Sequence, residues 1–205
     1  MSTVLHYDVL VIGSGPAGQK AAIQGAKAGK RVAMIECEPG VGGGCVYRGT
    51  IPSKTLRESA LQADRLKQSE TTPDRRTPPN VMVSTLMRRL NQVVTSHGDY
   101  MMNQLTRNGV ILFHGRAHFR SNNQIEMLTV DGMKQTFTAD TIVIATGSRP
   151  RAPVEIPIDH EHILDSDSIL SMIYLPRSLT VLGGGIIALE YASIFAALDV
   201  QVTII

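Results

Sequence analysis

The sequence has no tryptophan, few aromatic residues and only two cysteines, and each scarcity excludes a class of protein. Aromatic residues make up 4% of the 205 residues, although hydrophobic residues make up 43%, so we expect a core built from Val, Ile, Leu and Ala. Two cysteines, Cys37 and Cys45, are too few for a disulfide framework or a cysteine-rich metal centre. We therefore expect an α/β protein without a metal that works in a reducing compartment, the cytoplasm.

Long apolar runs and a strong net charge are also missing. No apolar run approaches the roughly 18 residues of a membrane span, and no basic patch precedes an apolar stretch near the N-terminus, as it would in a signal peptide. The formal net charge is only +2, which favours neither a nucleic acid nor a membrane as partner. We expect no partner of either kind.

The sequence does contain a glycine turn between an expected strand and an expected helix. An apolar run at residues 9–12 is followed by the turn and then by a helical pattern over 17–28. In such a turn Gly13 permits the tight bend, Gly15 lets a pyrophosphate approach the backbone, and Gly18 lets helix and strand pack closely. The residues of the turn are Gly13, Ser14, Gly15, Pro16, Ala17 and Gly18. This pattern predicts a dinucleotide site.

An acidic residue closes the next expected strand, at residues 31–36. Glu36 follows Gly18 by eighteen positions, where a carboxylate can accept the hydroxyls of an adenosine ribose. Cys37 and Glu38 begin the loop that follows, so we place them beside the same ribose.

A second glycine run stands at Gly42, Gly43 and Gly44, and leads to Cys45, Thr50 and Lys54. Consecutive glycines are unfavourable in regular structure by about 0.5–1 kcal/mol each, so the run indicates a close approach of backbone to a ligand. The stretch 42–54 resembles the flavin-side motif of the pyridine nucleotide-disulfide oxidoreductases. In that family two cysteines form a redox disulfide, and Cys45 stands where the first belongs.

Thr50 occupies the position of the second cysteine and has no redox chemistry of its own. A dithiol cannot form with one sulfur, and we expect no substitute pairing between Cys37 and Cys45. Within the family, this form of the motif resembles the branch that carries out transhydrogenation, moving a hydride between NADPH and NAD. The resemblance places Lys54 against the reactive nitrogen of the flavin.

Two shorter stretches match further family elements. The resemblance implies that the backbone near Gly115 and Ala117 recognises adenine. It also implies that the turn formed by Ala145, Thr146 and Gly147 covers FAD and leads out of its domain. We expect residues 124–130 and 135–138 to form a hairpin, and residues 141–145 to form a separate buried strand.

A second dinucleotide turn follows, with an expected strand at 179–182, a helix at 187–198 and a strand at 200–205. Its residues are Gly183, Gly184, Gly185, Ile186, Ile187 and Ala188. By resemblance, Glu190 pairs with Lys54, and Ile186 replaces a tyrosine gate and leaves the nicotinamide pocket open. We expect Gly183, Gly185, Ile186, Ile187 and Glu190 to face the nicotinamide nucleotide.

The expected fold is an FAD-binding, Rossmann-like domain of the glutathione-reductase type at residues 1–150. Residues 151–205 would form a linker and the start of a second, inserted Rossmann-like domain that binds NAD(P). We interpret the chain as the first part of a longer FAD enzyme, with NADPH and NAD as substrates, that forms homo-oligomers only at full length. We expect the apolar faces of 179–205 to lack covering layers. The alternatives are a dihydrolipoyl dehydrogenase or disulfide reductase relative, and a non-catalytic FAD-binding fragment.

Overall fold

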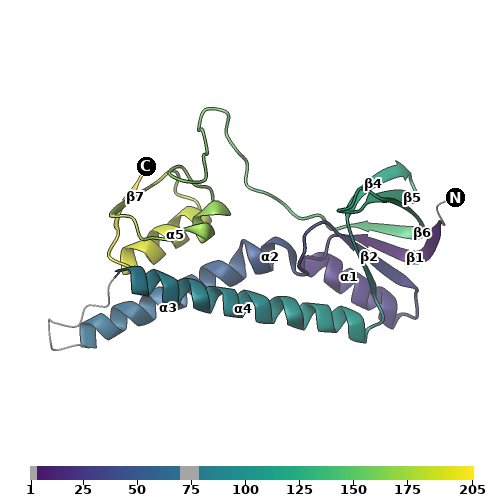
Figure 1. Ribbon diagram of the computed structural model, residues 1–205, viewed down its shortest axis with the longest axis horizontal. Helices are drawn as coiled ribbons and strands as arrows, with labels where there is room; N and C mark the ends of the chain where they lie inside the picture. The colour runs from purple at the N-terminus through teal and green to yellow at the C-terminus, as the bar shows by residue number, and fades with distance from the viewer. Residues whose placement is uncertain (1–3, 70–78) are drawn as a thin grey trace. The chain divides into compact units, whose positions relative to one another are not determined.

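The computed structural model describes residues 4–69 and 79–205 (Figure 1). The chain forms two compact units, and neither is continuous in sequence. The first unit comprises residues 1–47 and 95–149, and the second unit comprises residues 48–94 and 150–205. Residues 48–94 therefore share a unit with the C-terminal quarter of the chain and not with the first glycine turn.

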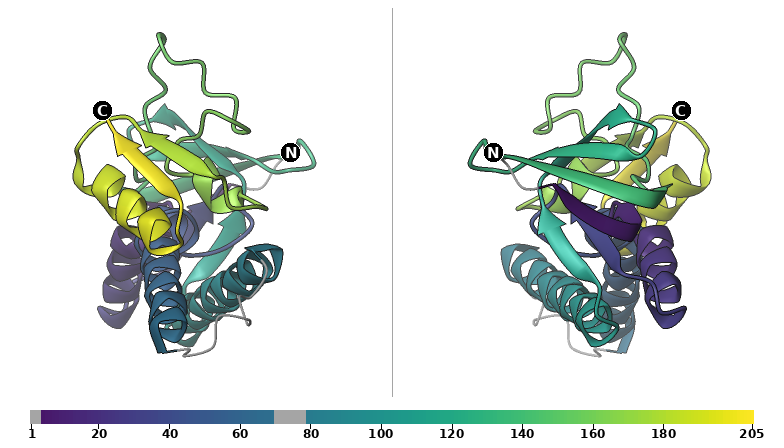
Figure 2. Two further views of the ribbon diagram at one scale, coloured as in Figure 1. Left: turned by 90° about the vertical axis from the view of Figure 1, so that its left-hand side faces the viewer. Right: turned by 90° about the vertical axis from the view of Figure 1, so that its right-hand side faces the viewer.

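The first unit is built on a six-stranded sheet with the order β3-β2-β1-β6-β5-β4. Strands β3, β2, β1 and β6 are parallel, whereas β5 and β4 continue the sheet as antiparallel strands. The right-hand view of Figure 2 shows these strands side by side, with β1 in purple. Their bounds are β1 Leu5–Ile12, β2 Val32–Glu36, β3 Ile111–His114, β4 Arg116–Ser121, β5 Gln124–Leu128 and β6 Lys134–Ile144.

Alternating side chains give the sheet two apolar faces. On one face Val11 and Met34 pack with Ile23 of helix α1, Pro16–Lys27, and with Leu105 of helix α4, Pro79–Arg107. On the other face Leu10, Ala33 and Ile35 pack with Ile125 and Phe137 from the antiparallel part. Because all five residues of β2 are buried, this strand lies at the centre of both cores, which is typical of a parallel sheet.

Three elements of the first unit differ from expectation. Residues 135–138 and 141–145 belong largely to one strand, β6, because Ala139 continues the buried alternation of Phe137 across the gap. Strand β4 was not predicted, because its residues are mostly exposed at the sheet edge and carry no apolar pattern. The glycine run forms a short helix, α2, at Gly43–Tyr47.

The second unit has a helical core beside a small parallel sheet. Its elements are α3 Thr50–Ser69, the first part of α4, the 3-10 helix η1 Ser168–Ser171, β7 Ser178–Val181, α5 Ile186–Ala197 and β8 Gln201–Ile204. Strands β7 and β8 pair in parallel. The polar, proline-rich stretch at 68–79 predicts a connector. Its residues 70–78 lie outside the described residues, while Gln68 and Ser69 belong to α3 and Pro79 to α4.

Helix α5 is exposed at its first turn and partly covered beyond it. Ile194 and Phe195 are buried in one core with Leu56 of α3 and Leu86 and Leu90 of α4. The expectation that this segment lacks covering layers was therefore wrong for this face of α5. The first turn of α5 fits it, because Ile186, Ile187 and Leu189 are exposed. Leu182, before the helix, and Ile205, after β8, are exposed as well.

Within the described residues, no helix combines the length and apolar character needed to cross a bilayer.

Candidate functional site

The first glycine turn lies between β1 and α1, and the structure shows why its glycines are needed. Gly13 has a φ of 102°, and a Cβ there would lie 2.8 Å from the carbonyl carbon of Ala145. A Cβ on Gly18 would overlap the Gly13 carbonyl. Gly15 is different, because a Cβ there would meet no protein atom within 4 Å. The Gly15 position thus leaves an open space at the N-terminus of α1, where backbone N–H groups attract anions.

The turn at Ala145, Thr146 and Gly147 packs directly on this first turn. The Ala145 N–H donates to the Ile12 carbonyl over 2.8 Å, and Ala145 and Thr146 surround the backbone of Gly13. The structure therefore brings together two motifs more than 120 residues apart that were both expected at the FAD site. Their contact with FAD stays a prediction.

Glu36 lies at the end of β2 with its carboxylate buried beside the same turn. Its Oε2 accepts hydrogen bonds from the Ser14 N–H at 2.8 Å and the Ser14 hydroxyl at 2.6 Å, and its Oε1 accepts from the Glu38 N–H at 2.8 Å. Burial alone would raise the pKa of Glu36, but these hydrogen bonds outweigh it and lower the pKa below its ordinary value. A carboxylate offers about four acceptor positions, and the Cys37 side chain donates to Glu36 as well, so a ribose hydroxyl would have to replace one of the present donors.

Ser14 was not singled out in the sequence as a functional residue. Besides its bonds to Glu36, its hydroxyl oxygen accepts the Gly42 N–H at 3.1 Å. Ser14 thus connects the first glycine turn, the ribose-side acid and the second glycine run. In the sequence, the only sign of this role is a small hydroxyl residue between two glycines.

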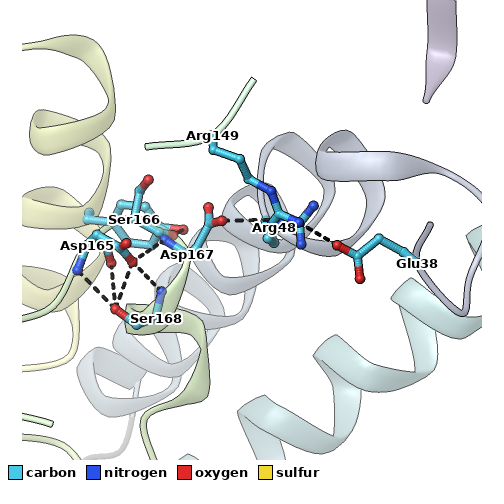
Figure 3. A network of polar contacts seen from close by, with 8 residues as sticks. Glu38, Arg48, Arg149, Asp165, Ser166, Asp167 and Ser168 are labelled. Carbon is cyan, nitrogen blue, oxygen red and sulfur yellow. Dashed lines mark hydrogen bonds and ion pairs between the residues drawn. The ribbon is translucent and has the colours of Figure 1, made fainter. Parts of the chain in front are cut away.

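The loop after β2 carries Cys37 and Glu38. Cys37 is a free cysteine in an exposed position, but its sulfur is partly buried. This partial burial, and after it the negative charge of Glu36, raise the pKa of the Cys37 thiol. Glu38 forms an ion pair with Arg149, which follows the turn at 145–147 (Figure 3). Cys45, on α2, is also a free thiol.

The second glycine run packs close to the first turn. A Cβ on Gly43 would lie 2.9 Å from the Gly15 Cα, whereas Gly44 has open space around it.

Tyr47, at the end of α2, is a residue of this region that the sequence did not indicate. A Cβ on Gly40 would lie 2.5 Å from the Cζ of Tyr47, and a Cβ on Gly98 would lie 2.8 Å from its hydroxyl oxygen. Gly98 does not break α4, which runs continuously through it.

Gly115 and Ala117 lie beside the end of β2. The Gly115 N–H donates to the Glu36 carbonyl at 2.8 Å, and Ala117 is half-buried in β4. A Cβ on Gly115 would lie 2.6 Å from the Leu128 carbonyl oxygen, so packing alone explains this glycine. Recognition of adenine by this backbone stays a prediction.

Lys54 of α3 and Glu190 of α5 form an ion pair in the second unit. The side chain of Lys54 is 59% exposed and that of Glu190 is 18% exposed. The pair is therefore not a buried one, and pairs this exposed contribute about 0–1 kcal/mol. The pair therefore contributes little to the stability of the unit.

The second glycine turn repeats the backbone geometry of the first. Gly183 has a φ of 100°, close to the 102° of Gly13. Gly185 precedes α5 with φ −74° and ψ 169°, and Gly15 precedes α1 with φ −63° and ψ 176°. The Gly183 N–H donates to the Ile205 carbonyl just as the Gly13 N–H donates to Ile35. The two turns are therefore the same structural device.

The residues around the second turn are open. No protein atom lies within 4 Å of a Cβ placed on Gly183, Gly184 or Gly185, and Ile186 and Ile187 are both exposed. This agrees with an accessible nucleotide turn.

A mostly parallel sheet with one glycine turn, followed by a second turn of equal geometry, is typical of the class of proteins that carry two Rossmann-like units. Residues 7–205 match the pyridine nucleotide-disulphide oxidoreductase family, and the chain belongs to this family. It is 46% identical over 209 residues to a soluble pyridine nucleotide transhydrogenase of Mycobacterium bovis (strain BCG / Pasteur 1173P2), covering 98% of this chain and 43% of that protein. A protein of the same name from Azotobacter vinelandii (strain DJ / ATCC BAA-1303) is 40% identical over 98% of this chain and 44% of its own length.

Solved structures agree with this family. LpdA from Mycobacterium tuberculosis superposes with a TM-score of 0.86 at 26% identity, over 98% of this chain and 44% of that one. RclA from Escherichia coli, a flavoprotein disulfide reductase solved as a Cu(II) complex, gives a TM-score of 0.82 at 31% identity. The match covers 97% of this chain and 42% of that chain. The chain thus spans less than half the length of the relatives it matches. The expected fold class, with FAD-type and NAD(P)-type Rossmann-like units, is confirmed.

Proposed function

We propose that the first unit binds FAD and that the whole protein transfers a hydride from NADPH to NAD. Two glycine turns of equal geometry carry the proposal, because one resident and one exchanging dinucleotide are what this reaction needs. The replacement of the second redox cysteine by Thr50 supports it, since two pyridine nucleotides can exchange a hydride without a dithiol. The names of the relatives, at 40–46% identity, point the same way.

The residues of the first unit suit FAD. The open space at Gly15 would take the pyrophosphate at the N-terminus of α1. Glu36 would accept the ribose hydroxyls, and the backbone of Gly43 and Gly44 would lie against the remainder of the cofactor. When bound, FAD would supply a ring that accepts and returns a hydride. Lys54, held by Glu190, would offer a positive charge to the reduced ring.

The second unit suits a nucleotide that enters and leaves. Its turn from Gly183 to Ile187 is exposed, and the N-terminus of α5 offers N–H groups for the phosphates. Ile186 is 86% exposed, so no bulky buried side chain at this position closes the approach. NADPH and NAD would use this turn in succession.

Matched substitutions of the two equivalent glycines test the assignment. Gly15→Ala adds a methyl group where no protein atom lies within 4 Å, so the fold tolerates it while the pyrophosphate loses its space. We expect the affinity for FAD to fall at least about tenfold, a loss of about 1.4 kcal/mol of binding free energy. Quenching of flavin fluorescence measures this affinity. The melting temperature of the unliganded chain should not change.

The control is Gly185→Ala, which should leave FAD binding intact and weaken NADPH binding instead. FMN, which lacks the adenosine half, should bind poorly to the wild-type chain. Equal binding of FAD by Gly15→Ala and the wild type, or comparable affinity for FMN, would contradict the assignment of the first turn.

A disulfide reductase is the second candidate, and the likeness to RclA at 31% identity favours it. That chemistry needs a redox pair of thiols, and this chain has only Cys37 and Cys45. Thiol titration separates the candidates: a gain of two thiols on reduction of bound flavin would support the reductase, whereas NADPH-dependent bleaching of flavin absorbance without that gain would support transhydrogenation. FAD binding without bleaching would leave a non-catalytic FAD-binding chain.

A further inference from the structure

The Lys54–Glu190 ion pair joins two helices through a contact that is too weak to fix its own geometry. Lys54 lies on α3 and Glu190 on α5, and the lysine side chain is more than half exposed. Pairs of long, exposed side chains hold one geometry poorly. Apolar packing between α3 and α5 keeps the helices together, but hydrophobic burial is not directional. Directional contacts elsewhere in the unit can set how the two charges meet.

A hydrogen-bonded turn at residues 165–168 supplies such contacts (Figure 3). The Oδ1 of Asp165 accepts hydrogen bonds from the Asp167 N–H at 3.0 Å, the Ser168 N–H at 2.7 Å and the Ser168 hydroxyl at 2.8 Å. Burial would raise the pKa of Asp165, but these bonds outweigh it and lower the pKa. The carboxylate therefore stays charged and holds the turn in one conformation near neutral pH.

This turn is tied to both helices of the pair. The Oδ2 of Asp167 lies 3.4 Å from the Nε of Arg48, two residues before α3 begins. The hydroxyl of Tyr191, the neighbour of Glu190 on α5, donates to the Ser166 carbonyl at 3.4 Å. Burial raises the pKa of Tyr191 to about 12, so its hydroxyl remains a donor.

We propose that Arg48, Asp167 and Tyr191 are positioning residues that set the geometry of the Lys54–Glu190 pair through the turn at 165–168. The contacts form a closed path within the second unit, from Arg48 through the turn to Tyr191, along α5 to Glu190, and across to Lys54. The inference rests on the proposed function only in taking this pair to serve the flavin. The path itself is a property of the chain without cofactor.

Competitive acetylation of lysines measures the pair directly. The full chain, without flavin, is treated with limiting acetic anhydride and then with excess deuterated reagent, and mass spectrometry gives the labelling of Lys54 relative to exposed Lys20 on α1. Acylation requires the amine to leave its carboxylate partner, so Glu190→Gln should raise relative labelling of Lys54 about two- to fivefold. Tyr191→Phe and Asp167→Asn should each produce at least half of that rise.

Tyr174→Phe is the matched control, because Tyr174 is an exposed tyrosine of the same unit, and it should leave labelling unchanged. Tyr191→Phe keeps the buried ring, so it remains informative if Asp167→Asn does not fold. The proposal is overturned if Glu190→Gln raises the labelling of Lys54 but Tyr191→Phe leaves it at the wild-type value. It is also overturned if Glu190→Gln leaves the labelling of Lys54 unchanged. Failure of FAD to bind affects neither result, so it would count only against the proposed function.

Discussion

At the scale of single residues, Gly98 is explained by the Tyr47 side chain that packs against it and not by the helix in which it lies. It lies within α4, where alanine would be favoured by about 0.8–1.0 kcal/mol. A Cβ there would lie 2.8 Å from the Tyr47 hydroxyl oxygen, and Gly40 crowds the same ring from another direction. Tyr47 therefore has little room to yield.

We predict that Gly98→Ala destabilises the wild-type chain but stabilises a Tyr47→Phe background. Overpacking costs about 1–3 kcal/mol, which exceeds the gain in helix propensity, and removing the hydroxyl removes the clash. Urea unfolding of the wild type, the two single variants and the double variant measures the sign of the stability change in both backgrounds. The same sign of change in both backgrounds would show that the Tyr47 hydroxyl does not determine this glycine.

Ser14 and Glu36 predict a pH-dependent stability. Because the folded pKa of Glu36 is lowered, its stabilisation is present above its unfolded pKa and is lost as the pH falls through the folded pKa. Ser14→Ala removes a hydrogen bond to this carboxylate and leaves the Gly42 N–H without its acceptor. We expect a loss of about 1–3 kcal/mol at pH 7.

The gap between the unfolding free energies of the wild type and Ser14→Ala should shrink as the pH falls through the lowered pKa of Glu36 in the wild type, because the protonated carboxyl no longer forms a charge-assisted hydrogen bond with Ser14. Urea titrations at pH 7 and pH 3 measure it, with Ser148→Ala, an exposed serine, as control. If the stability difference between the two proteins stays constant with pH, the contribution of Ser14 does not depend on the charge of Glu36.

At the scale of secondary structure elements, α5 predicts two opposite responses to the same substitution. Ile194 is 2% exposed in the core with α3 and α4, whereas Ile186 is 86% exposed. We expect Ile194→Ala to cost about 2–5 kcal/mol and Ile186→Ala to change stability by less than about 0.5 kcal/mol. Thermal unfolding followed by circular dichroism compares them. Similar small effects would mean that α5 does not pack as described.

The elements that the sequence predicted were those whose signals are local. The glycine turns were predictable because Gly13 and Gly183 adopt a conformation that other residues avoid, and the apolar periods on either side set strand and helix. Strand β4 was not, because an exposed edge strand needs no apolar alternation. The contact of Tyr47 with Gly98 was not predictable either, because 51 positions separate the two residues and neither residue type indicates the presence of the other.

The candidate site shows the same division. The pairing of Lys54 with Glu190 was predicted by resemblance, and the structure contains it. Ser14 and the turn at Asp165 lacked a signal for their partners, because a hydroxyl or carboxylate finds its hydrogen-bond donors only when distant segments meet. Nothing in the sequence indicated that the residues of this turn reach Arg48 and Tyr191.

At the scale of the whole molecule, the two discontinuous units predict the outcome of proteolysis. Residues 150–162 form no helix or strand, and Val154 is 97% exposed. Trypsin should cut first after Arg151, because Arg149 precedes a proline. Residues 48–94 and 150–205 share one core, so we expect the two fragments to elute together in size-exclusion chromatography.

Arg151→Gln should slow this first cut, which provides the control. Separation of the fragments without denaturant would mean that the chain divides near residue 150 and that the shared core does not hold.

The shared core of the second unit also has a consequence for synthesis on the ribosome. Leu56, Leu86 and Leu90 are made early, but Tyr191, Ile194 and Phe195, which bury them, are made roughly 100 residues later. At about 5–20 residues per second, α3 and the first part of α4 wait on the order of 5–20 seconds with their apolar sides uncovered. The nascent chain therefore passes through an interval in which it offers a chaperone a defined pair of helices, and that interval closes only when α5 emerges.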